Sequence, residues 1–406
     1  MDLRYDDSER AKEFAEKTRE FIDEVVLPVE RDVLGEGPVS EAVVDELREE
    51  AQEYGVYAPH LPEEYGGHDL SYRDMLPVFE EAGRSLLGAT AVRVDAPDEG
   101  NMHTLEMFGT EEQKEEWLRP LVQGEARSGF SMTEPSPGAG SDPKMIQTTA
   151  EKDGDEWVID GHKWWTTQGT EADVLIVMAR TDQDAHPYSG CSLFLVPADT
   201  EGVNVVRDIP HTGGGVTGVG HAEIEYDNVR VPESALLGEL NEGFTHAQQR
   251  LGPARLTHCM RYSGMAERAL DVAKAYVTER EAFDGPLSEK QSVRFNVAEA
   301  EMKLHAIRTM VRHAARQIEA GEEARIPVSM AKVFAANATQ EIIDDALQMC
   351  GGSGISKDLP IADFYESVRQ FRIVDGADEV HKRVIARAAF DDPEIDPEEL
   401  TNLPTF

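Results

Sequence analysis

Cysteine is scarce in this sequence and long apolar runs are missing. The 406 residues include three cysteines, Cys191, Cys259 and Cys350, whose odd number and unpaired spacing argue against a disulfide framework and against a cysteine-based zinc site. The longest uninterrupted apolar run, residues 174–179, is far too short to span a bilayer. The acidic first residues lack the apolar stretch of a signal peptide. We therefore expect a soluble, cytoplasmic protein.

Positive charge is also in short supply. Lys and Arg number 39, only 12 of them Lys, against 79 Asp and Glu, which gives a formal net charge of −40 at pH 7. A field of this sign repels phosphate backbones and anionic lipid surfaces, so we expect neither nucleic acid nor a membrane as a partner. The acidic residues are spread along the whole chain in small clusters. Such a lysine-poor surface is typical of proteins kept soluble in concentrated salt, and we interpret the chain as halophilic.

The spacing of apolar residues divides the chain into three zones. From about residue 8 to 125, apolar residues recur three and four apart, as on one face of a helix. From about 128 to 240 the pattern changes to short stretches that read as strands, separated by turn signals such as Asp153-Gly154 and Asp160-Gly161. The helical spacing returns at about 243 and persists to about 391.

These zones predict an α+β protein with three domains. We expect an N-terminal α-helical domain over residues 1–127 and a small antiparallel β domain over 128–240, because short strands without long helices between them are typical of a small barrel or sandwich. Residues 241–406 are expected to form a C-terminal α-helical bundle, because long amphipathic helices with short connections favour antiparallel packing.

Two segments of the middle zone contain residue types that suit a large planar ligand. Residues 130–142 read FSMTEPSPGAGSD, where small residues and hydroxyls expose backbone N–H groups that can hold a flat heterocycle or a phosphate. Residues 160–169 read DGHKWWTTQG, and the adjacent Trp164 and Trp165 suit packing against a planar ring. Taken alone, the first segment is equally typical of an ordinary loop, and a Trp pair is more often part of a core.

Together these segments resemble the acyl-CoA dehydrogenase family, whose signature runs T-E-P-G-A-G-S-D and then G-x-K-x-W-I-T-N-G. This chain has two extra residues, Ser136-Pro137, and has Thr166 and Gln168 in place of Ile and Asn. In the C-terminal zone, REAF at 280–283 followed by Gln291 resembles the family's R-x-x-F-G…Q, with Asp in place of its Gly.

The resemblance covers essentially the whole chain. QMCGGSG at 348–354 resembles the family's Q-x-x-G-G-x-G. Segments 96–102, 250–261 and 375–381 resemble one particular branch of the family, in which the animal proteins carry the dehydrogenase module behind a kinase-like domain.

The resemblance implies an FAD-dependent oxidoreductase. The α proton of an acyl-CoA thioester would leave to a carboxylate base while the β hydrogen leaves as hydride to flavin N5, giving the trans-2-enoyl-CoA, and an electron-transfer flavoprotein would receive the electrons. The residues implied at the flavin ring are Phe130, Met132, Thr133, Trp165 and Thr167. Those implied at the adenine and pyrophosphate end, reaching it from a neighbouring subunit, are Arg280, Phe283, Gln291, Gln348 and Gly352. Ser141 and Arg255 would face CoA, and a site completed by a neighbour implies a homodimer or homotetramer.

The resemblance also implies the position of the base. The family's usual Y-E-G-T reads Val374-Asp375-Gly376-Ala377 here, and the alternative position used by some members, just before the CoA-contacting Arg, is Ala254, which cannot accept a proton. Asp375 is therefore the predicted base; the competing interpretation is a solvated Asp in an Asp-Gly turn. Asp is shorter than Glu by one methylene, about 1.5 Å. We also expect burial under flavin and acyl chain to raise its pKa towards the working pH.

Two other functions remain open at this point. Nitroalkane oxidases resemble this family and use an Asp base without CoA, so a flavin oxidase is the first alternative. The second is an idle flavin protein that binds nucleic acid, against which the lack of a basic domain argues. His258, His305, His313 and His381 show no metal-binding spacing, so we predict no metal and interpret them as helix-face residues.

Overall fold

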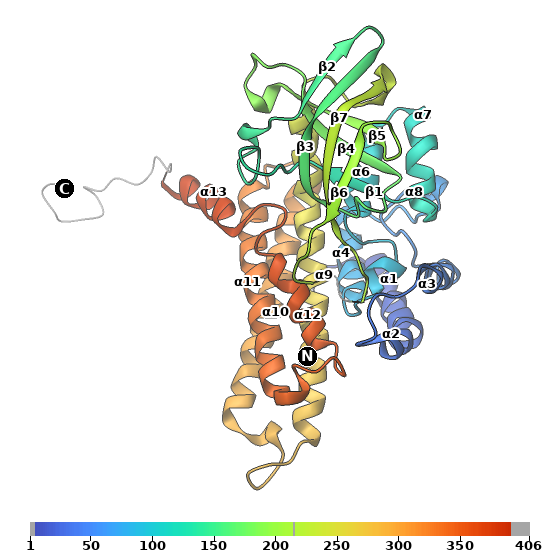
Figure 1. The fold of residues 1–406 in the computed structure, drawn as a ribbon. Helices are drawn as coiled ribbons and strands as arrows, with labels where there is room; N and C mark the ends of the chain where they lie inside the picture. Colours follow the sequence, from blue (N-terminus) through green and yellow to red (C-terminus); the bar gives the residue numbers. More distant parts are fainter. Residues whose placement is uncertain (1–4, 214–215, 391–406) are drawn as a thin grey trace, which may run out of the picture.

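The computed structural model describes residues 5–213 and 216–390 and contains three regions in the predicted order, helical, β and helical (Figure 1). The first region is built from eight helices: α1 (Glu9–Phe21), α2 (Leu27–Val33), α3 (Glu41–Tyr54), α4 (Tyr72–Ala82), α5 (Gly88–Ala91), α6 (Asp98–Phe108), α7 (Glu111–Gln113) and α8 (Arg119–Gln123). Helix α1 begins at Ser8, whose hydroxyl accepts a hydrogen bond from the N–H of Ala11. Helix α3 ends at Gly55, at a φ of +69° that glycine adopts without strain.

The middle region is one sheet with the strand order β6-β7-β3-β2-β4-β5-β8, and β1 also pairs with β4. Its strands are β1 (Ser128–Ser131), β2 (Thr149–Asp153), β3 (Glu156–Thr167), β4 (Val174–Arg180), β5 (Cys191–Pro197), β6 (Val203–Asp208), β7 (His221–Pro232) and β8 (Leu236–Leu237). Most pairings are antiparallel, as predicted, but β1 runs parallel to β4, so the sheet is mixed.

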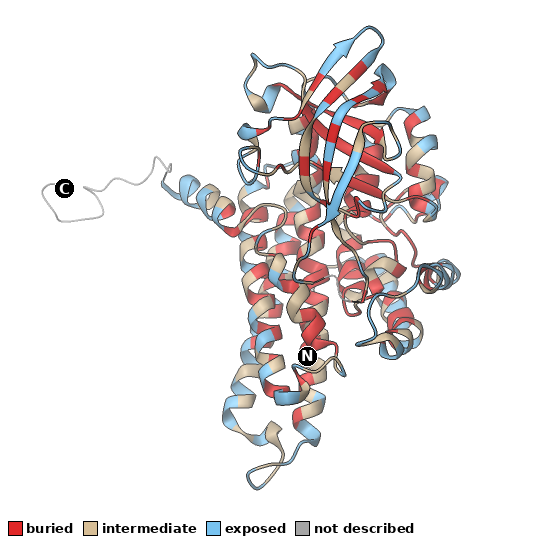
Figure 2. Ribbon diagram, viewed as in Figure 1, coloured by how far each residue is buried: buried red, intermediate tan, exposed pale blue. Residues whose placement is uncertain are grey.

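Strand β4 contains the six-residue apolar run because both of its faces are buried. Val174, Ile176 and Met178 belong to the core shared with the helices, whereas Leu175 and Val177 belong to the core of the β region itself. Successive side chains of a strand point to opposite faces, so a strand between two cores is apolar at every position. Figure 2 shows the buried interior of the sheet where it meets the helices.

The C-terminal region consists of α9 (Gly243–Glu279), α10 (Gln291–Glu319), α11 (Arg325–Cys350), α12 (Ile361–Gln370) and α13 (Asp378–Phe390). Helix α9 packs against α10 and α11 and also contacts α4 and α6 of the first region. Gly264 of α9 allows the close approach to α4, because a Cβ there would lie 2.0 Å from the main-chain oxygen of Glu80. Among residues 5–213 and 216–390, no helix is both long and apolar enough to cross a membrane.

Candidate functional site

The connection between α12 and α13 carries the predicted base. Asp375 and Gly376 both have left-handed backbones, with φ of +55° and +100°. This turn faces the first half of α9, where Arg255 Nε donates a hydrogen bond of 2.8 Å to the main-chain oxygen of Asp375. The Asp375 side chain is only 17 % exposed, and its Oδ2 lies 3.2 Å from His258 Nδ1. Asp375 is therefore enclosed between helices, unlike an ordinary turn Asp.

Four basic side chains surround the Asp375 carboxylate. Burial raises the pKa of Asp375, but His258, Arg250, Arg255 and Lys332 lower it, and the net pKa lies below the ordinary Asp value. The pKa of Asp375 is thus lowered, whereas we expected it to be raised. Burial alone would raise it, but the fold also brings basic groups close to the carboxylate. The carboxylate is consequently ionised at neutral pH, the form that can accept a proton.

His258 and His381 lie on helices, as expected, and both contact the Asp375 turn. Nδ1 of His258 lies 2.6 Å from the main-chain oxygen of Ala254, which can only accept, so Nδ1 carries the hydrogen. Burial, helped by Arg261, lowers the pKa of His258 to about 4, and the ring is neutral at pH 7. His381 is buried, and burial lowers its pKa to about 4 as well. His258 lies three residues after Arg255, a spacing that places both on one side of α9 and was a usable signal.

Arg250, which motif reasoning did not single out, joins three elements at the site. Its guanidinium lies 4.3 Å from the centre of the Phe130 ring in β1, and its Nε donates 3.1 Å to Asn101 Oδ1 in α6. A Cβ on Gly100 would lie 3.0 Å from this guanidinium, so glycine makes the room. Thus segments 96–102 and 250–261, which shared a resemblance, are in contact.

The five residues predicted at the flavin ring come from the ends of β1 and β3. The N–H of Trp164 donates 3.0 Å to the oxygen of Thr133, which ties the extension of β1 to β3. Phe130, Met132, Thr133 and Thr167 are half-buried, and Trp165 is 42 % exposed. A half-exposed indole beside apolar side chains and hydroxyls fits a planar heterocycle such as the isoalloxazine ring, because its exposed aromatic surface suits packing against a flat ring.

A buried ion pair stabilises the segment that follows β1, beside the residues predicted at the flavin ring. Lys163 Nζ donates 2.9 Å to Glu134 Oε1 and 2.9 Å to the oxygen of Met132. Glu134 also accepts from the N–H groups of Gln147 and Thr148. The two extra residues, 136–137, are exposed, so they extend into solvent without displacing these bonds. Ser141 is exposed on the same loop, and no contact described in this chain joins it to Arg255.

Within one chain, the residues predicted at the adenine and pyrophosphate end of FAD do not lie near the residues predicted at the flavin ring. All five are exposed: Arg280, Phe283, Gln291, Gln348 and Gly352. Helix α9 begins beside the sheet, and 37 helical residues, about 55 Å, separate that end from the end that precedes Arg280 (Figure 1). Phe283 is 87 % exposed, which is unusual for a large aromatic side chain.

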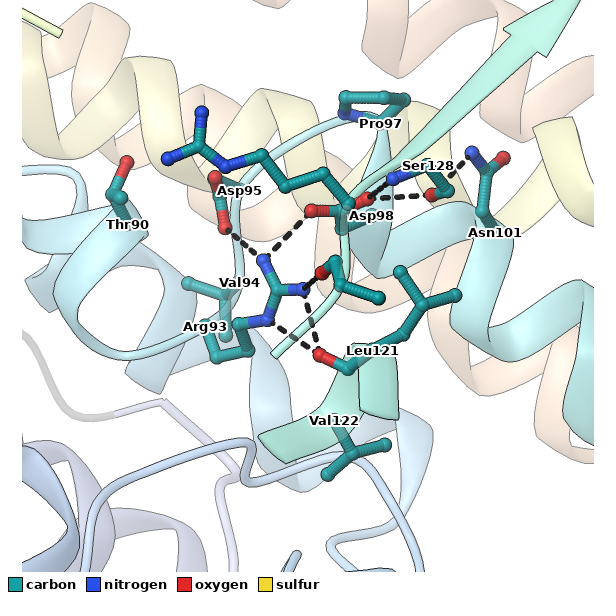
Figure 3. A network of polar contacts seen from close by, with 12 residues as sticks. Thr90, Arg93, Val94, Asp95, Pro97, Asp98, Asn101, Leu121, Val122 and Ser128 are labelled. Carbon is teal, nitrogen blue, oxygen red and sulfur yellow. Dashed lines mark hydrogen bonds and ion pairs between the residues drawn. The ribbon is translucent and has the colours of Figure 1, made fainter. Parts of the chain in front are cut away.

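A buried polar network fastens α6 to the start of β1 (Figure 3). Arg93 Nη1 donates 2.7 Å to Asp98 Oδ2, and both side chains are completely buried. Asp98 Oδ1 accepts 2.9 Å from the N–H of Ser128, and Asn101 Nδ2 donates 2.9 Å to the hydroxyl of the same serine. Asn101 in turn holds Arg250, so the network reaches from the N-terminal helices to the candidate site.

Comparison with known proteins covers most of the chain in all three regions. It matches the family models "Acyl-CoA dehydrogenase, N-terminal domain" over residues 8–125, "middle domain" over 129–229 and "C-terminal domain" over 241–390. The "Probable acyl-CoA dehydrogenase FadE2" of Mycobacterium tuberculosis is 42 % identical over 94 % of this chain and 95 % of its own length.

Two further comparisons show the same likeness. "Acyl-CoA dehydrogenase family member 11" of Gallus gallus is 36 % identical over 94 % of this chain, which spans about half of that animal protein. The solved structure of butyryl-CoA dehydrogenase from Megasphaera elsdenii superposes with a TM-score of 0.84 at 28 % identity, covering 96 % of this chain and 100 % of that one.

Proposed function

Because this chain belongs to the acyl-CoA dehydrogenase family, we propose that it oxidises an acyl-CoA thioester to the trans-2-enoyl-CoA with Asp375 as the α-proton base. The chain is an oxidoreductase acting on acyl-CoA, and FAD is its cofactor. One observation carries the assignment of the base. Asp375 Oδ2 is buried and, within the described residues, accepts no hydrogen bond, because the His258 N–H that lies near it is directed to Ala254. An ionised oxygen with a free lone pair is what proton abstraction requires.

The chain's own groups divide the remaining tasks. Asp375 takes the α proton as the α C–H bond breaks, and Arg255 fixes the main-chain oxygen of Asp375 from α9. FAD, when bound, would supply the two-electron oxidant, to which the β hydrogen would leave as hydride. The proposed contacts of its ring are Phe130, Met132, Thr133, Trp165 and Thr167. Ser141 and Arg255 are proposed to face CoA, where a guanidinium pairs well with phosphate.

A neighbouring copy of the chain is proposed to complete the flavin site. The exposure of Phe283 and the length of α9 support this, since one copy cannot bring both ends of the site together. Arg280, Gln291, Gln348 and Gly352 would act beside Phe283 in a homodimer or homotetramer. An electron-transfer flavoprotein is proposed to accept the electrons from the reduced flavin. We also propose a reducing, cytoplasmic location, which the three buried, unpaired cysteines support.

Anaerobic titration of the purified flavoprotein with a panel of acyl-CoAs tests the proposed function. We expect one chain-length class to bleach the flavin absorbance near-stoichiometrically, because proton abstraction and hydride transfer reduce the flavin once per site. The reduced protein should be reoxidised faster by an electron-transfer flavoprotein than by oxygen. Bleaching by nitroalkanes with rapid oxygen consumption would favour the oxidase instead. A flavin that no acyl-CoA bleaches, with DNA binding in high salt, would favour the idle alternative.

We also propose that the protein is halophilic, and its stability against KCl tests this. With a net charge of −40, the folded chain repels itself, and salt shortens the Debye length from about 10 Å at 0.1 M to about 3 Å at 1 M. The melting temperature should therefore rise with KCl, most steeply below about 1 M. Sucrose at matched osmolality, which does not screen charge, should give a smaller rise. Full stability in dilute buffer would contradict the hypothesis.

A further inference from the structure

Three side chains from three helices converge on the two carbonyl groups of the Asp375-Gly376 turn. Arg255 of α9 donates 2.8 Å to the oxygen of Asp375, and His381 Nε2 of α13 lies 3.3 Å from the same oxygen. Lys332 Nζ of α11 donates 2.8 Å to the oxygen of Gly376. A left-handed backbone at Asp375 is costly for a residue with a side chain and persists only where the surroundings hold it.

The environment of Lys332 is unusual for a lysine. Its side chain is completely buried, 3.6 Å from Asp378 Oδ1 and 5.2 Å from the centre of the Phe371 ring. Asp378 is almost completely buried, and its Oδ2 accepts 2.9 Å from Asn337 Nδ2. Replacing a buried ion pair with apolar groups is often neutral or stabilising, so such a pair is weak evidence for a purely structural role.

We infer that Lys332 is a positioning residue for the base: by holding the Gly376 carbonyl it fixes the backbone from which the Asp375 carboxylate projects. The inference rests on the proposed function. An aspartate base is about 1.5 Å shorter than the glutamate that the family usually places here, so its reach depends more closely on where its backbone lies. A misplacement near 1 Å costs about 10²-fold in rate. The hydrogen bond from Lys332 in α11 keeps this backbone in position. The nearby Asp378 carboxylate favours the charged form of the buried Lys332 ammonium.

The experiment distinguishes the hydrogen bond from Lys332 to the Gly376 carbonyl from the ion pair between Lys332 and Asp378. Lys332→Met alone leaves Asp378 buried without its lysine and can fail to fold. The double variant Lys332→Met/Asp378→Asn removes both charges, retains the shapes and lacks the bond to Gly376. It also loses the ion pair between Asp378 and Arg372 Nε at 3.2 Å, which Arg372→Met removes by itself and thereby controls for. We expect it to hold FAD and to melt near the wild-type temperature, while single-turnover flavin reduction by the acyl-CoA slows about 10²-fold with a nearly unchanged Kd for acyl-CoA. Lys303→Met, which removes a half-buried lysine paired with Glu341 on the same bundle, should reduce its flavin at the wild-type rate.

Amide hydrogen exchange supplies a readout that needs no substrate. In the substrate-free flavoprotein, the peptide covering residues 371–380 should exchange faster in the double variant than in Arg372→Met, which lacks the Arg372–Asp378 pair but keeps Lys332 on Gly376. In Lys303→Met this peptide should exchange as in the wild type. A wild-type reduction rate in the double variant, or unchanged exchange in this peptide, would overturn the role of Lys332. Faster exchange in a protein whose wild type no acyl-CoA bleaches would instead overturn the proposed function and, with it, any role for Lys332 in catalysis.

Discussion

Asp375→Asn is expected to yield a protein that binds FAD and leaves it oxidised when acyl-CoA is added. The amide is nearly isosteric with the carboxylate, and none of the five proposed flavin-ring contacts lies in the α12–α13 connection, so the flavin should be retained. The amide cannot accept the α proton. Loss of a general base costs about 10²–10⁴-fold, and stopped-flow flavin absorbance should show reduction slowed by at least this factor.

A matched control distinguishes a base from a turn residue. Asp153 also precedes a glycine in a turn, but its side chain is 63 % exposed and pairs with Arg230 on the surface. Asp153→Asn should therefore reduce its flavin at the wild-type rate. If Asp375→Asn does the same, Asp375 is a solvated turn residue after all. If it loses the flavin, the turn is needed for folding and its role as base must be tested by Asp375→Glu.

The glutamate variant tests the geometry of the base. The backbone of the turn is held by Arg255 and Lys332, so a side chain longer by about 1.5 Å would extend past the position that the aspartate occupies. A carboxylate in the wrong place is still a base. Asp375→Glu should consequently retain more activity than Asp375→Asn but less than the wild type.

The order of the three regions could be predicted because apolar periodicity is a local property. Helical spacing in the first and last zones, and strand-like stretches between them, correspond to the helices and strands of the structure. The parallel pairing of β1 with β4 could not be predicted in this way, because Ser128 and Val174 meet only through the tertiary fold. The apolar run in β4 was visible, but its cause, a second core on the outer face, depends on the helices.

The candidate site was predictable only where a motif marked it. Asp375 stood in a recognisable position, whereas Arg250 and Lys332 are 125 and 43 residues away in sequence and reach it through helix packing. The direction of the Asp375 pKa shift was predicted wrongly for the same reason. Burial could be foreseen for a site covered by a cofactor, but Arg250 and Lys332 reach the carboxylate through long-range contacts that no spacing encodes.

Asp98→Ala is expected to have the largest effect on stability of any single change considered. It would leave the completely buried Arg93 guanidinium without its partner at 2.7 Å and with only Asp95 at 3.8 Å, and removing one partner of a buried pair costs about 3–5 kcal/mol. Ser128 would also lose the acceptor of its backbone N–H. Chemical denaturation followed by fluorescence and circular dichroism should show the midpoint falling steeply, with α6 and β1 loosened first.

The double variant Arg93→Met/Asp98→Asn tests how much of the stability loss comes from leaving the Arg93 guanidinium without Asp98. It should recover part of the lost stability, because the Arg93 and Asp98 charges are both removed and the Asn oxygen can still accept from Ser128. The recovery should be incomplete because Asp95, 3.8 Å from Arg93 Nη1, loses that guanidinium. Glu115→Ala, which breaks an exposed ion pair with Arg119, should leave the midpoint unchanged. Equal losses in Asp98→Ala and in the double variant would show that the Arg93 hydrogen bonds to the main-chain oxygens of Leu121 and Ala126, which the double variant also lacks, matter as much as the unpaired charge.

The pH dependence of the Asp98→Ala loss follows from the direction of the Asp98 pKa. Burial raises this pKa, but Arg93 and the hydrogen bonds from Ser128 lower it, so the folded value lies below that of the unfolded chain. The stabilisation by the ionised carboxylate is therefore complete above the unfolded pKa and is lost as the pH falls through the folded one. The stability gap between wild type and Asp98→Ala should be constant near neutral pH and narrow in strong acid. A stability gap that persists unchanged in acid would mean that Asp98 is not the ionised partner of Arg93.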